Sequence, residues 1–130
     1  QLVNLFDTDE AICIFPAGLV SRKIDGEVMD LEWKKTFITM SKKHNRTIVP
    51  IYIDGKLSNF FYRLASLRKA IGIKANIEMF FLVDELFKQK NATMKLTFGK
   101  PIYPESLSKL RSQKEWANEI RNQVYSYSEK

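Results

Sequence analysis

Short apolar runs alternate with helical patterns along this chain, and this alternation restricts its fold more than any other feature. Continuous apolar or β-branched runs predict buried strands, whereas apolar residues spaced three and four apart predict one face of a helix. Strands that alternate with helices are typical of an α/β protein, in which helices flank a mixed, largely parallel sheet. We expect strands at 11–15, 47–53 and 93–98, helices at 30–45, 59–71 and 113–126, and either a helix or a strand leading into one at 76–90.

Several residues predict where these elements begin and end. Ser58 is placed to cap the second helix, Asp30 to cap the first, and Gly72 to end the second. Residues 16–29 should form a loop, and Pro50 should mark a sheet edge, a bulge or a strand end because it lacks a backbone donor. We expect these side chains to face inward: Trp33, Phe37, Met40, Phe60, Phe61, Leu64, Leu67, Ile71, Trp116, Ile120, Val124 and Tyr127.

The length of 130 residues suits one domain, and we expect residues 1–130 to form it. The chain begins at Gln1 inside what reads as the end of a helix, so we expect it to be the C-terminal portion of a longer domain. The net charge of +6 favours anionic partners. Cys13 has no partner in the chain, which favours a reducing compartment and a small buried side chain rather than a reactive thiol.

The loop after the strand at 11–15 is the strongest candidate for chemistry. Ligands of open α/β sheets bind beyond the carboxyl ends of the strands, where this loop should lie. Pro16 fixes one backbone angle, and Gly18 permits a conformation that a side chain would block. Ser21 and Arg22 then follow, and the planar guanidinium of arginine suits the paired oxygens of a phosphate.

These residues also resemble a known family. The block "FPAGLVSR", followed by Trp33 and Phe37, then "IVPIYIDG", "LVDELF" and "LTFGKPI", resembles the glycerolipid acyltransferase superfamily. Within it the chain looks most like the bacterial hemolysin-like branch that includes ornithine-lipid acyltransferases. The resemblance runs from about residue 11 to residue 103. It implies transfer of a fatty acyl group from acyl-CoA or acyl carrier protein to a lysolipid or phosphate-bearing acceptor, with no further cofactor.

The resemblance also implies a set of site residues. It places Phe15, Pro16, Gly18, Ser21 and Arg22 in the acceptor site, and it makes Val49, Pro50 and Ile51 line that site. Ala17 stands where many members carry Glu, and Leu19 stands where the hemolysin-like branch often carries Glu. The second difference puts the identity of the acceptor in doubt.

The catalytic motif of that superfamily, His-x-x-x-x-Asp, is not found in this sequence. In the superfamily the His acts as general base on the acceptor hydroxyl, and the Asp orients the imidazole. The single histidine, His44, has Val49 where the Asp would stand, and it falls at an expected helix end. We interpret His44 as a non-catalytic surface residue. Because the motif lies upstream of Phe-Pro-x-Gly in the superfamily, we expect it before Gln1 and expect these 130 residues alone to be inactive.

Two aromatic clusters leave an alternative open. Phe60, Phe61 and Tyr62, and then Met79, Phe80, Phe81 and Leu82, are either core residues or an acyl-chain groove or membrane-contacting patch. Nearby Lys56, Arg63, Arg68 and Lys69 suit an anionic bilayer surface. We expect a cytoplasmic protein peripheral to the inner membrane, without nucleic-acid partners, and with no metal site. A sheet edge or an apolar face left exposed would let the piece dimerise or persist only as a proteolytic remnant.

The runner-up function is a noncatalytic basic module that binds lipid or nucleic acid. Its support is the positive charge alone, since no recognition motif for nucleic acid is present. Other catalytic readings are weaker. Asp84 and Glu85 are adjacent, so they do not face each other on a helix, and no His/Cys/Asp cluster has the spacing of metal ligands.

Overall fold

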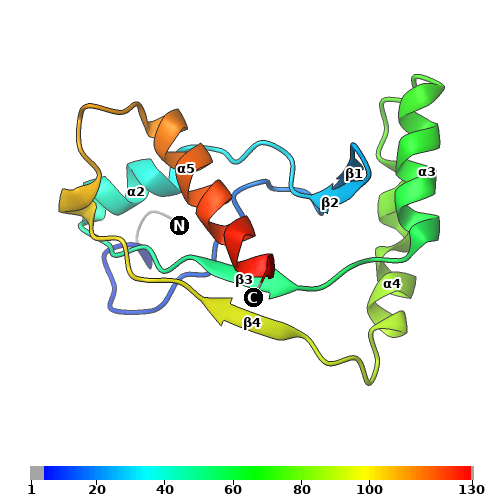
Figure 1. Ribbon diagram of the computed structural model, residues 1–130, viewed down its shortest axis with the longest axis horizontal. Coiled ribbons are helices and arrows are strands. Elements are labelled where there is room, and N and C mark those ends of the chain that lie inside the picture. The colour runs from blue at the N-terminus through cyan, green and yellow to red at the C-terminus, as the bar shows by residue number, and fades with distance from the viewer. Residues whose placement is uncertain (1–4, 130) are drawn as a thin grey trace.

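The computed structural model describes residues 5–129, and it has a mixed α/β fold drawn out along one axis (Figure 1). Helices α2 (Thr36–His44) and α5 (Gln113–Tyr125) contact each other at one end, where α5 also contacts strand β3 (Ile51–Asp54). Helices α3 (Asn59–Ala70) and α4 (Leu82–Lys88) stand at the other end. A hairpin of β1 (Arg22–Ile24) and β2 (Glu27–Met29) lies between the two ends.

The described strands pair differently from the prediction of a largely parallel sheet. Within residues 5–129 they form two separate two-stranded sheets, and both are antiparallel. Strand β3 pairs with β4 (Lys95–Phe98), and Ile51 stands opposite Phe98. Helices α3 and α4 form an excursion between the two strands (Figure 1), so the chain returns to β3 in the opposite direction. The class is confirmed as mixed α/β, but the parallel arrangement is not shown.

Pro50 sits at a β-bulge, one of the three positions predicted for it. Beyond the pair Ile51–Phe98, an isolated bridge joins Ile48 to Ile102. Between these two pairs, Val49 and Pro50 stand opposite Gly99, Lys100 and Pro101, so the second strand carries one extra residue. The backbone N–H of Gly99 donates to the carbonyl of Pro50 at 2.8 Å.

The main core lies between α2, α5 and the Pro16–Gly18 turn. Trp33 and Phe37 meet edge-on with ring centroids 5.9 Å apart, as expected for a buried aromatic pair. On α5, Ile120 and Val124 are buried and Trp116 packs against them, which confirms these three members of the predicted stripe. The fourth, Tyr127, lies beyond the end of α5 in η3 (Ser126–Glu129) and is only half-buried. The buried members of this core are Ala17, Trp33, Phe37, Ile38, Leu107, Ala117, Ile120 and Val124.

The hairpin β1–β2 was missed, because residues 16–29 were expected to be a loop. Asp25 and Gly26 occupy its tight turn with φ angles of 50° and 92°. Two successive positive φ angles are the geometry of the tight turn that Asp-Gly favours between antiparallel strands. The Asp-Gly pair was therefore the sequence signal that could have predicted the hairpin. The turn brings Arg22 opposite Met29.

Residues 11–15 are not the buried strand that their apolar character predicted. They take no regular secondary structure, Ile14 is 42% exposed and Cys13 is exposed rather than buried. A run of this kind is buried as a strand only when neighbouring strands and helices cover both faces. Among residues 5–129 no strand pairs with this segment.

One face of the β3–β4 sheet is also apolar and uncovered in the described structure. Ile51 pairs with Phe98 and Ile53 with Leu96, and all four side chains are more than one-third exposed. The second strand is therefore buried on one face only, and not on both as expected. This bare face matches the exposed sheet surface on which the predicted dimer depends, and the dimer itself stays a prediction.

Helix α3 begins where the sequence predicted, and a buried carboxylate supports its cap. The Ser58 hydroxyl accepts a hydrogen bond from the N–H of Phe61, as an N-cap does. Glu85 of α4 in turn accepts from the Ser58 hydroxyl and the Ser58 N–H, and from Lys88 at 2.7 Å. Glu85 is 1% exposed, so these contacts fix the start of α3 against α4.

The Glu85 contacts predict a specific dependence of stability on pH. Burial alone would raise the pKa of Glu85, but the hydrogen bonds from Lys88 and Ser58 outweigh it and lower the pKa below the ordinary 4.5. The folded protein therefore holds this proton more weakly than the unfolded chain does. The stabilisation is complete above the ordinary pKa and is lost as the pH falls below it. We expect the melting temperature of Glu85→Gln to fall less steeply than that of the wild type between about pH 5 and pH 3. Parallel melting curves would contradict this role.

The buried face of α3 differs from the predicted stripe. Phe61, Tyr62 and Ala65 are buried, whereas Phe60, Leu67 and Ile71 are more than half exposed. Gly72, with φ of 77°, ends the helix as expected. Residues 76–90 resolve into a 3₁₀ helix η1 (Ile77–Phe81) that runs directly into α4. The helical alternative for this segment is therefore confirmed.

Candidate acceptor site

The predicted acceptor loop forms a tight turn on the surface of the core. The N–H of Gly18 donates to the carbonyl of Phe15 at 3.0 Å, and the N–H of Lys34 donates to the carbonyl of Pro16 at 3.0 Å. Gly18 has a φ of 68°, a conformation that side chains disfavour. Phe15 is 69% exposed, while Ala17 is buried. The loop thus has the fixed shape that Pro16 and Gly18 predicted.

Asp30 was predicted to cap a helix, but in the structure it anchors the far end of this loop instead. Its carboxylate accepts from the Ser21 hydroxyl at 2.6 Å and from the Trp33 indole at 2.9 Å. Its backbone N–H donates to the Tyr125 hydroxyl, and its carbonyl accepts from Arg121. Helix α2 begins six residues later, and its N-cap is Lys35. Asp30 therefore fixes Ser21 to the core and to α5.

Arg22 is held by the protein on several sides. One guanidinium nitrogen donates to the carbonyls of Val20 and Ser21, and the other lies 2.7 Å from Oε1 of Glu78. The guanidinium carbon is 5.6 Å from the centre of the Phe61 ring, in cation–π range. The side chain is 12% exposed. Arg22 is therefore a fixed part of a wall rather than a mobile surface arginine.

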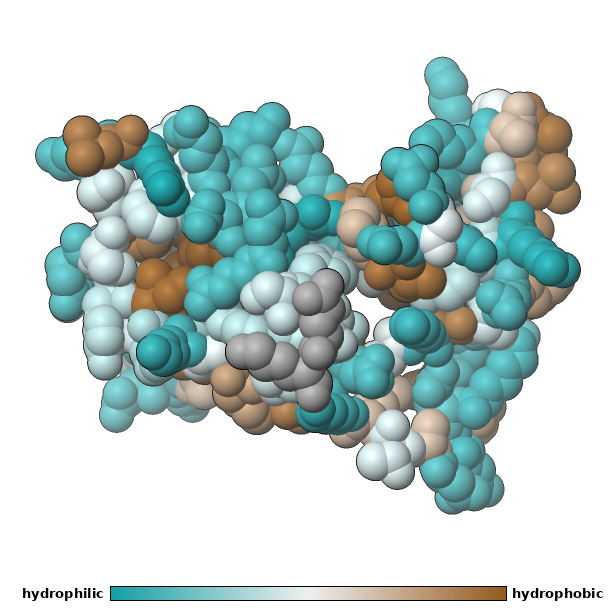
Figure 2. Space-filling view, viewed as in Figure 1, coloured by the Kyte–Doolittle hydropathy of each residue, from teal (hydrophilic) through white to brown (hydrophobic). Residues whose placement is uncertain are grey.

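A cavity of about 390 Å³ lies where the hairpin faces α3, and Arg22 is in its wall. Figure 2 shows apolar surface between the hairpin and α3. Four cationic side chains line the cavity together with aliphatic ones, so it suits a ligand with an anionic group and an apolar part. The lining residues are Leu19, Arg22, Lys23, Ile24, Leu31, Ala65, Ser66, Arg68, Lys69 and Asn76.

The second predicted block, Val49–Ile51, lies at the bulge of the other sheet. Val49 is 46% and Ile51 38% exposed, and Pro50 is buried. Tyr125 links this region to the loop, because its ring meets Tyr52 edge-on at 6.1 Å while its hydroxyl binds the backbone of Asp30. None of these three residues lines the cavity beside Arg22. Their place in the acceptor site stays a prediction.

His44 is not the surface histidine that its position predicted. Its side chain is 6% exposed, and its Nδ1 lies 2.6 Å from Oδ1 of Asp7. Phe6 stacks beside the imidazole with ring centroids 5.5 Å apart. Nε2, the atom that would take a proton from an acceptor hydroxyl, is buried and has no hydrogen-bond partner among the described residues. Asp7 contacts the imidazole as an orienting carboxylate would, but Nε2 is buried, so we do not assign His44 as the catalytic base.

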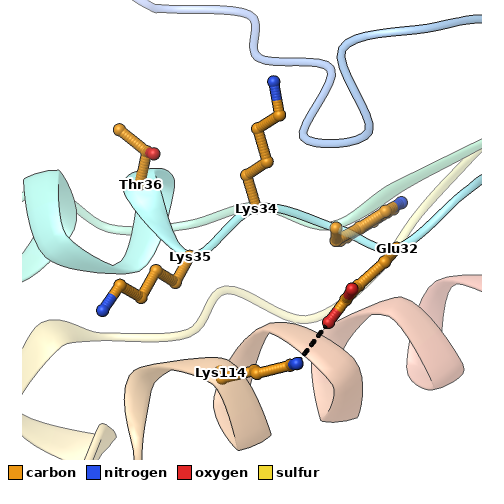
Figure 3. A pocket seen from close by; sticks show the side chains of 6 residues that line it. Glu32, Lys34, Lys35, Thr36 and Lys114 are labelled. Carbon is orange, nitrogen blue, oxygen red and sulfur yellow. Dashed lines mark ion pairs between the residues drawn. The ribbon is translucent and has the colours of Figure 1, made fainter.

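A second hollow of about 520 Å³ lies at the start of α2 (Figure 3). Lys34, Lys35 and Lys114 line it, and Lys114 forms an ion pair with Glu32 at 2.7 Å. Its wide, exposed shape and its paired charge make it a weaker candidate than the cavity at Arg22. Among residues 5–129, no three His, Cys, Asp or Glu side chains gather into a group that could hold a metal ion.

Comparison with known proteins identifies the family. The model of a family described as "Acyltransferase" matches residues 3–130, nearly the whole chain. This chain belongs to that acyltransferase family. The resemblance seen in the Phe-Pro-x-Gly and Val-Pro-Ile blocks is thereby confirmed, and no solved structure gives a significant match.

Two curated relatives of this acyltransferase chain carry the same name. A lyso-glycine lipid O-acyltransferase of Phocaeicola vulgatus is 47% identical over 92% of this chain and 43% of its own length. A lyso-glycine lipid O-acyltransferase of Bacteroides thetaiotaomicron is 46% identical over 92% of this chain and 44% of its own length. The chain therefore spans less than half the length of the curated relatives it matches. Neither name refers to a hemolysin or to an ornithine lipid.

Glu78 is the site residue that sequence analysis missed. It is completely buried and lies against both Arg22 and Arg68. The available signal was a single acidic residue inside the apolar run "NIEMFF". An ionised carboxylate is seldom buried without a cationic partner, so that pattern could have pointed to one.

Proposed function

We propose that this protein is an O-acyltransferase that moves a fatty acyl group to a hydroxyl of a lysolipid, and that these residues bind the acceptor. Membership of the acyltransferase family supports the reaction, and the two relatives support a lyso-glycine lipid as the acceptor class. The observation that carries the binding role is the cavity at Arg22. It combines cationic groups with aliphatic walls beside the Pro16–Gly18 loop. That combination fits an acidic amphiphile.

The reaction we propose uses acyl-CoA or acyl carrier protein as the donor. The acceptor hydroxyl oxygen attacks the thioester carbonyl, a C–O bond forms, the C–S bond breaks, and the thiol leaves with a proton. A general base that takes the hydroxyl proton would speed this step. The His-x-x-x-x-Asp motif is not among these 130 residues, so we assign no catalytic base in this chain. We place Phe15, Pro16, Gly18, Ser21 and Arg22 at the acceptor, with Val49–Ile51 nearby.

Deletion of the gene in its native host tests this function in the cell. We expect a lysolipid to accumulate and its O-acylated product to decrease, because the proposed reaction consumes the first and forms the second. Reintroducing the wild-type gene should restore the product, whereas a copy with Arg22→Ala should restore little of it. The measurement is mass spectrometry of extracted lipids. An unchanged lipid profile after deletion would argue against the proposal.

We also propose that the protein binds the cytoplasmic side of the inner membrane as a peripheral protein. No helix in the described part of the chain is long and apolar enough to span a bilayer. The region of η1 and α4 supports peripheral binding, since Phe80 is 84%, Val83 62%, and Leu86 and Phe87 each 71% exposed. Exposed basic side chains accompany them, including Lys56, Arg63, Lys88 and Lys90. Exposed apolar side chains on α4, with exposed basic residues on and next to the same helix, suit an anionic lipid surface.

Replacing Phe87 by Asp should lower binding to anionic vesicles about 10-fold, because a buried aromatic side chain contributes roughly 1.5–3 kcal/mol to such transfer. The measurement is co-sedimentation of the full-length protein with vesicles of phosphatidylethanolamine and phosphatidylglycerol. Leu110→Asp is the matched control, since Leu110 is 96% exposed in the loop before α5. Equal losses for the two variants would exclude α4 as the membrane contact.

A further inference from the structure

Glu78 is buried between two arginines from distant parts of the chain. Its Oε1 lies 2.7 Å from Arg22, at the start of β1, and its Oε2 lies 2.8 Å from Nε of Arg68, in the last turn of α3. The second contact is an ion pair without the alignment of a hydrogen bond. The Glu78 side chain is 0% exposed, while those of Arg22 and Arg68 are 12% and 13% exposed.

This arrangement joins three segments that are otherwise separate. Glu78 belongs to η1, Arg22 follows the acceptor loop, and Arg68 also donates to the carbonyl of Ile73 at 2.7 Å. Two guanidinium groups this close repel each other, and the carboxylate between them offsets that repulsion. Without Glu78, the exposed surface nearby would offer both arginines a better-solvated position.

The two arginines are also in the wall of the cavity, whereas Glu78 is not among its lining residues. Arg22, Lys23, Arg68 and Lys69 carry four positive charges, and the single carboxylate of Glu78 leaves a net charge of three. Leu19 and Leu31 give the same cavity aliphatic surface. Lys69 is exposed, so its ammonium is free to approach a ligand.

A buried, ion-paired carboxylate contributes little to the stability of the fold by itself. Well-packed apolar residues often serve a core as well as or better than a buried ion pair does. Here Glu78 fixes Arg22 and Arg68 in the wall of a cavity, where an anionic ligand could contact both guanidinium groups. We propose that Glu78 is a positioning residue that holds Arg22 and Arg68 in this wall, where they and Lys69 receive the anionic head group of the acceptor. This inference rests on the proposed acyltransferase function.

Binding of a charged and an uncharged amphiphile tests the proposal without using catalysis. The probes are N-lauroylglycine and its primary amide, which share one chain and differ in the carboxylate. They are titrated by calorimetry, below their micelle concentrations, into the full-length protein. We expect the wild type to bind the acid about 10-fold more tightly than the amide, the scale of one charge-assisted contact. Equal binding of the two probes by the wild type would overturn the proposal.

Three variants then separate positioning from folding. Glu78→Gln should abolish the preference for the acid and leave affinity for the amide unchanged. Lys69→Gln, an exposed substitution that leaves the fold intact, should reduce the preference about threefold, as a rim charge does. Glu85→Gln is the matched control, because Glu85 is equally buried and ion-paired but does not line the cavity. It should lose stability and keep the preference.

The outcomes distinguish this proposal from the proposed function. A full preference in Glu78→Gln or in Lys69→Gln, or its loss in Glu85→Gln, would overturn the positioning role. If Glu78→Gln does not fold, the Lys69→Gln result decides. Acyl transfer is assayed separately on the wild type. Absence of transfer with the preference intact would count against the acyltransferase function, and transfer without any preference would count against the role of Glu78.

Discussion

Replacing Phe61 by Ala should lower the free energy of unfolding by about 3–5 kcal/mol, the range for a fully buried phenylalanine. Phe61 is 0% exposed and is the buried contact of α3 with the Arg22 guanidinium. Its ring also meets that of Tyr62 edge-on, with centroids 6.0 Å apart. The loss combines the transfer of the side chain to water with the cavity left behind. Urea denaturation of the full-length protein measures it.

The adjacent Phe60 is the matched control for this substitution. It is 51% exposed, and its main contacts are an edge-on ring pair with Phe81 at 5.2 Å and Lys88 above its face. Such a partly exposed aromatic pair contributes about 1 kcal/mol. Phe60→Ala should therefore cost about 1 kcal/mol. If both variants lose the same stability, the inward face assigned to α3 is wrong.

Replacing Arg22 by Ala should lower kcat/KM for an anionic lysolipid about 10- to 100-fold, mainly through KM. One charge-assisted hydrogen bond contributes about 1.5–3 kcal/mol, and about 1.4 kcal/mol corresponds to a factor of 10. Arg22→Lys should recover part of the loss, because it keeps the charge without the planar fork. The measurement is acyl transfer at varied acceptor concentration.

Arg111→Ala provides the control for removing one arginine. Arg111 is half exposed and forms an ion pair of 3.5 Å with Glu119, away from the cavity. Exposed pairs of this kind contribute little, so this variant should have the kinetics of the wild type. Wild-type kinetics in Arg22→Ala would instead remove Arg22 from the acceptor site.

Local sequence patterns predicted where helices and strands begin and end better than they predicted which strands pair with each other. Ser58 caps α3, the stripe of Trp116, Ile120 and Val124 packs in the core, and the strand at 93–98 is present as β4. Each of these follows from interactions within a few residues. The antiparallel pairing of β3 with β4 depends on how the α3–α4 excursion turns back, which no local pattern records.

The choice of the buried face on α3 shows why burial was harder to predict. Both Phe60–Leu64–Leu67–Ile71 and Phe61–Tyr62–Ala65 are apolar, so periodicity alone did not separate them. The structure buries the second set, on the side where Arg68 reaches Glu78. The apolar run at 11–15 was also predicted to be buried and is exposed, because its burial depends on strands that no described residue supplies.

The candidate site was predictable only where its residues lie close together in the sequence. Pro16, Gly18 and Arg22 were identified from residue type and spacing, and the structure places Arg22 in the cavity wall beside a turn made by the other two. The contribution of α3 was not visible, since Arg68 and Lys69 are far from Arg22 in sequence. The lone Glu78 in an apolar run indicated a buried ion pair, but its partners Arg22 and Arg68 are too far away in sequence to be identified from the local pattern.

We propose that this protein transfers acyl groups to a lysolipid hydroxyl, and an acyl-transfer assay is the direct test of that activity. The full-length protein is incubated with acyl-CoA or acyl carrier protein labelled in the acyl chain, a lyso-glycine lipid, and a matched lipid without the hydroxyl. We expect labelled O-acylated product from the lyso-glycine lipid and none from the lipid without the hydroxyl. Label that stays on the donor, or appears only as free fatty acid with every acceptor, would contradict it.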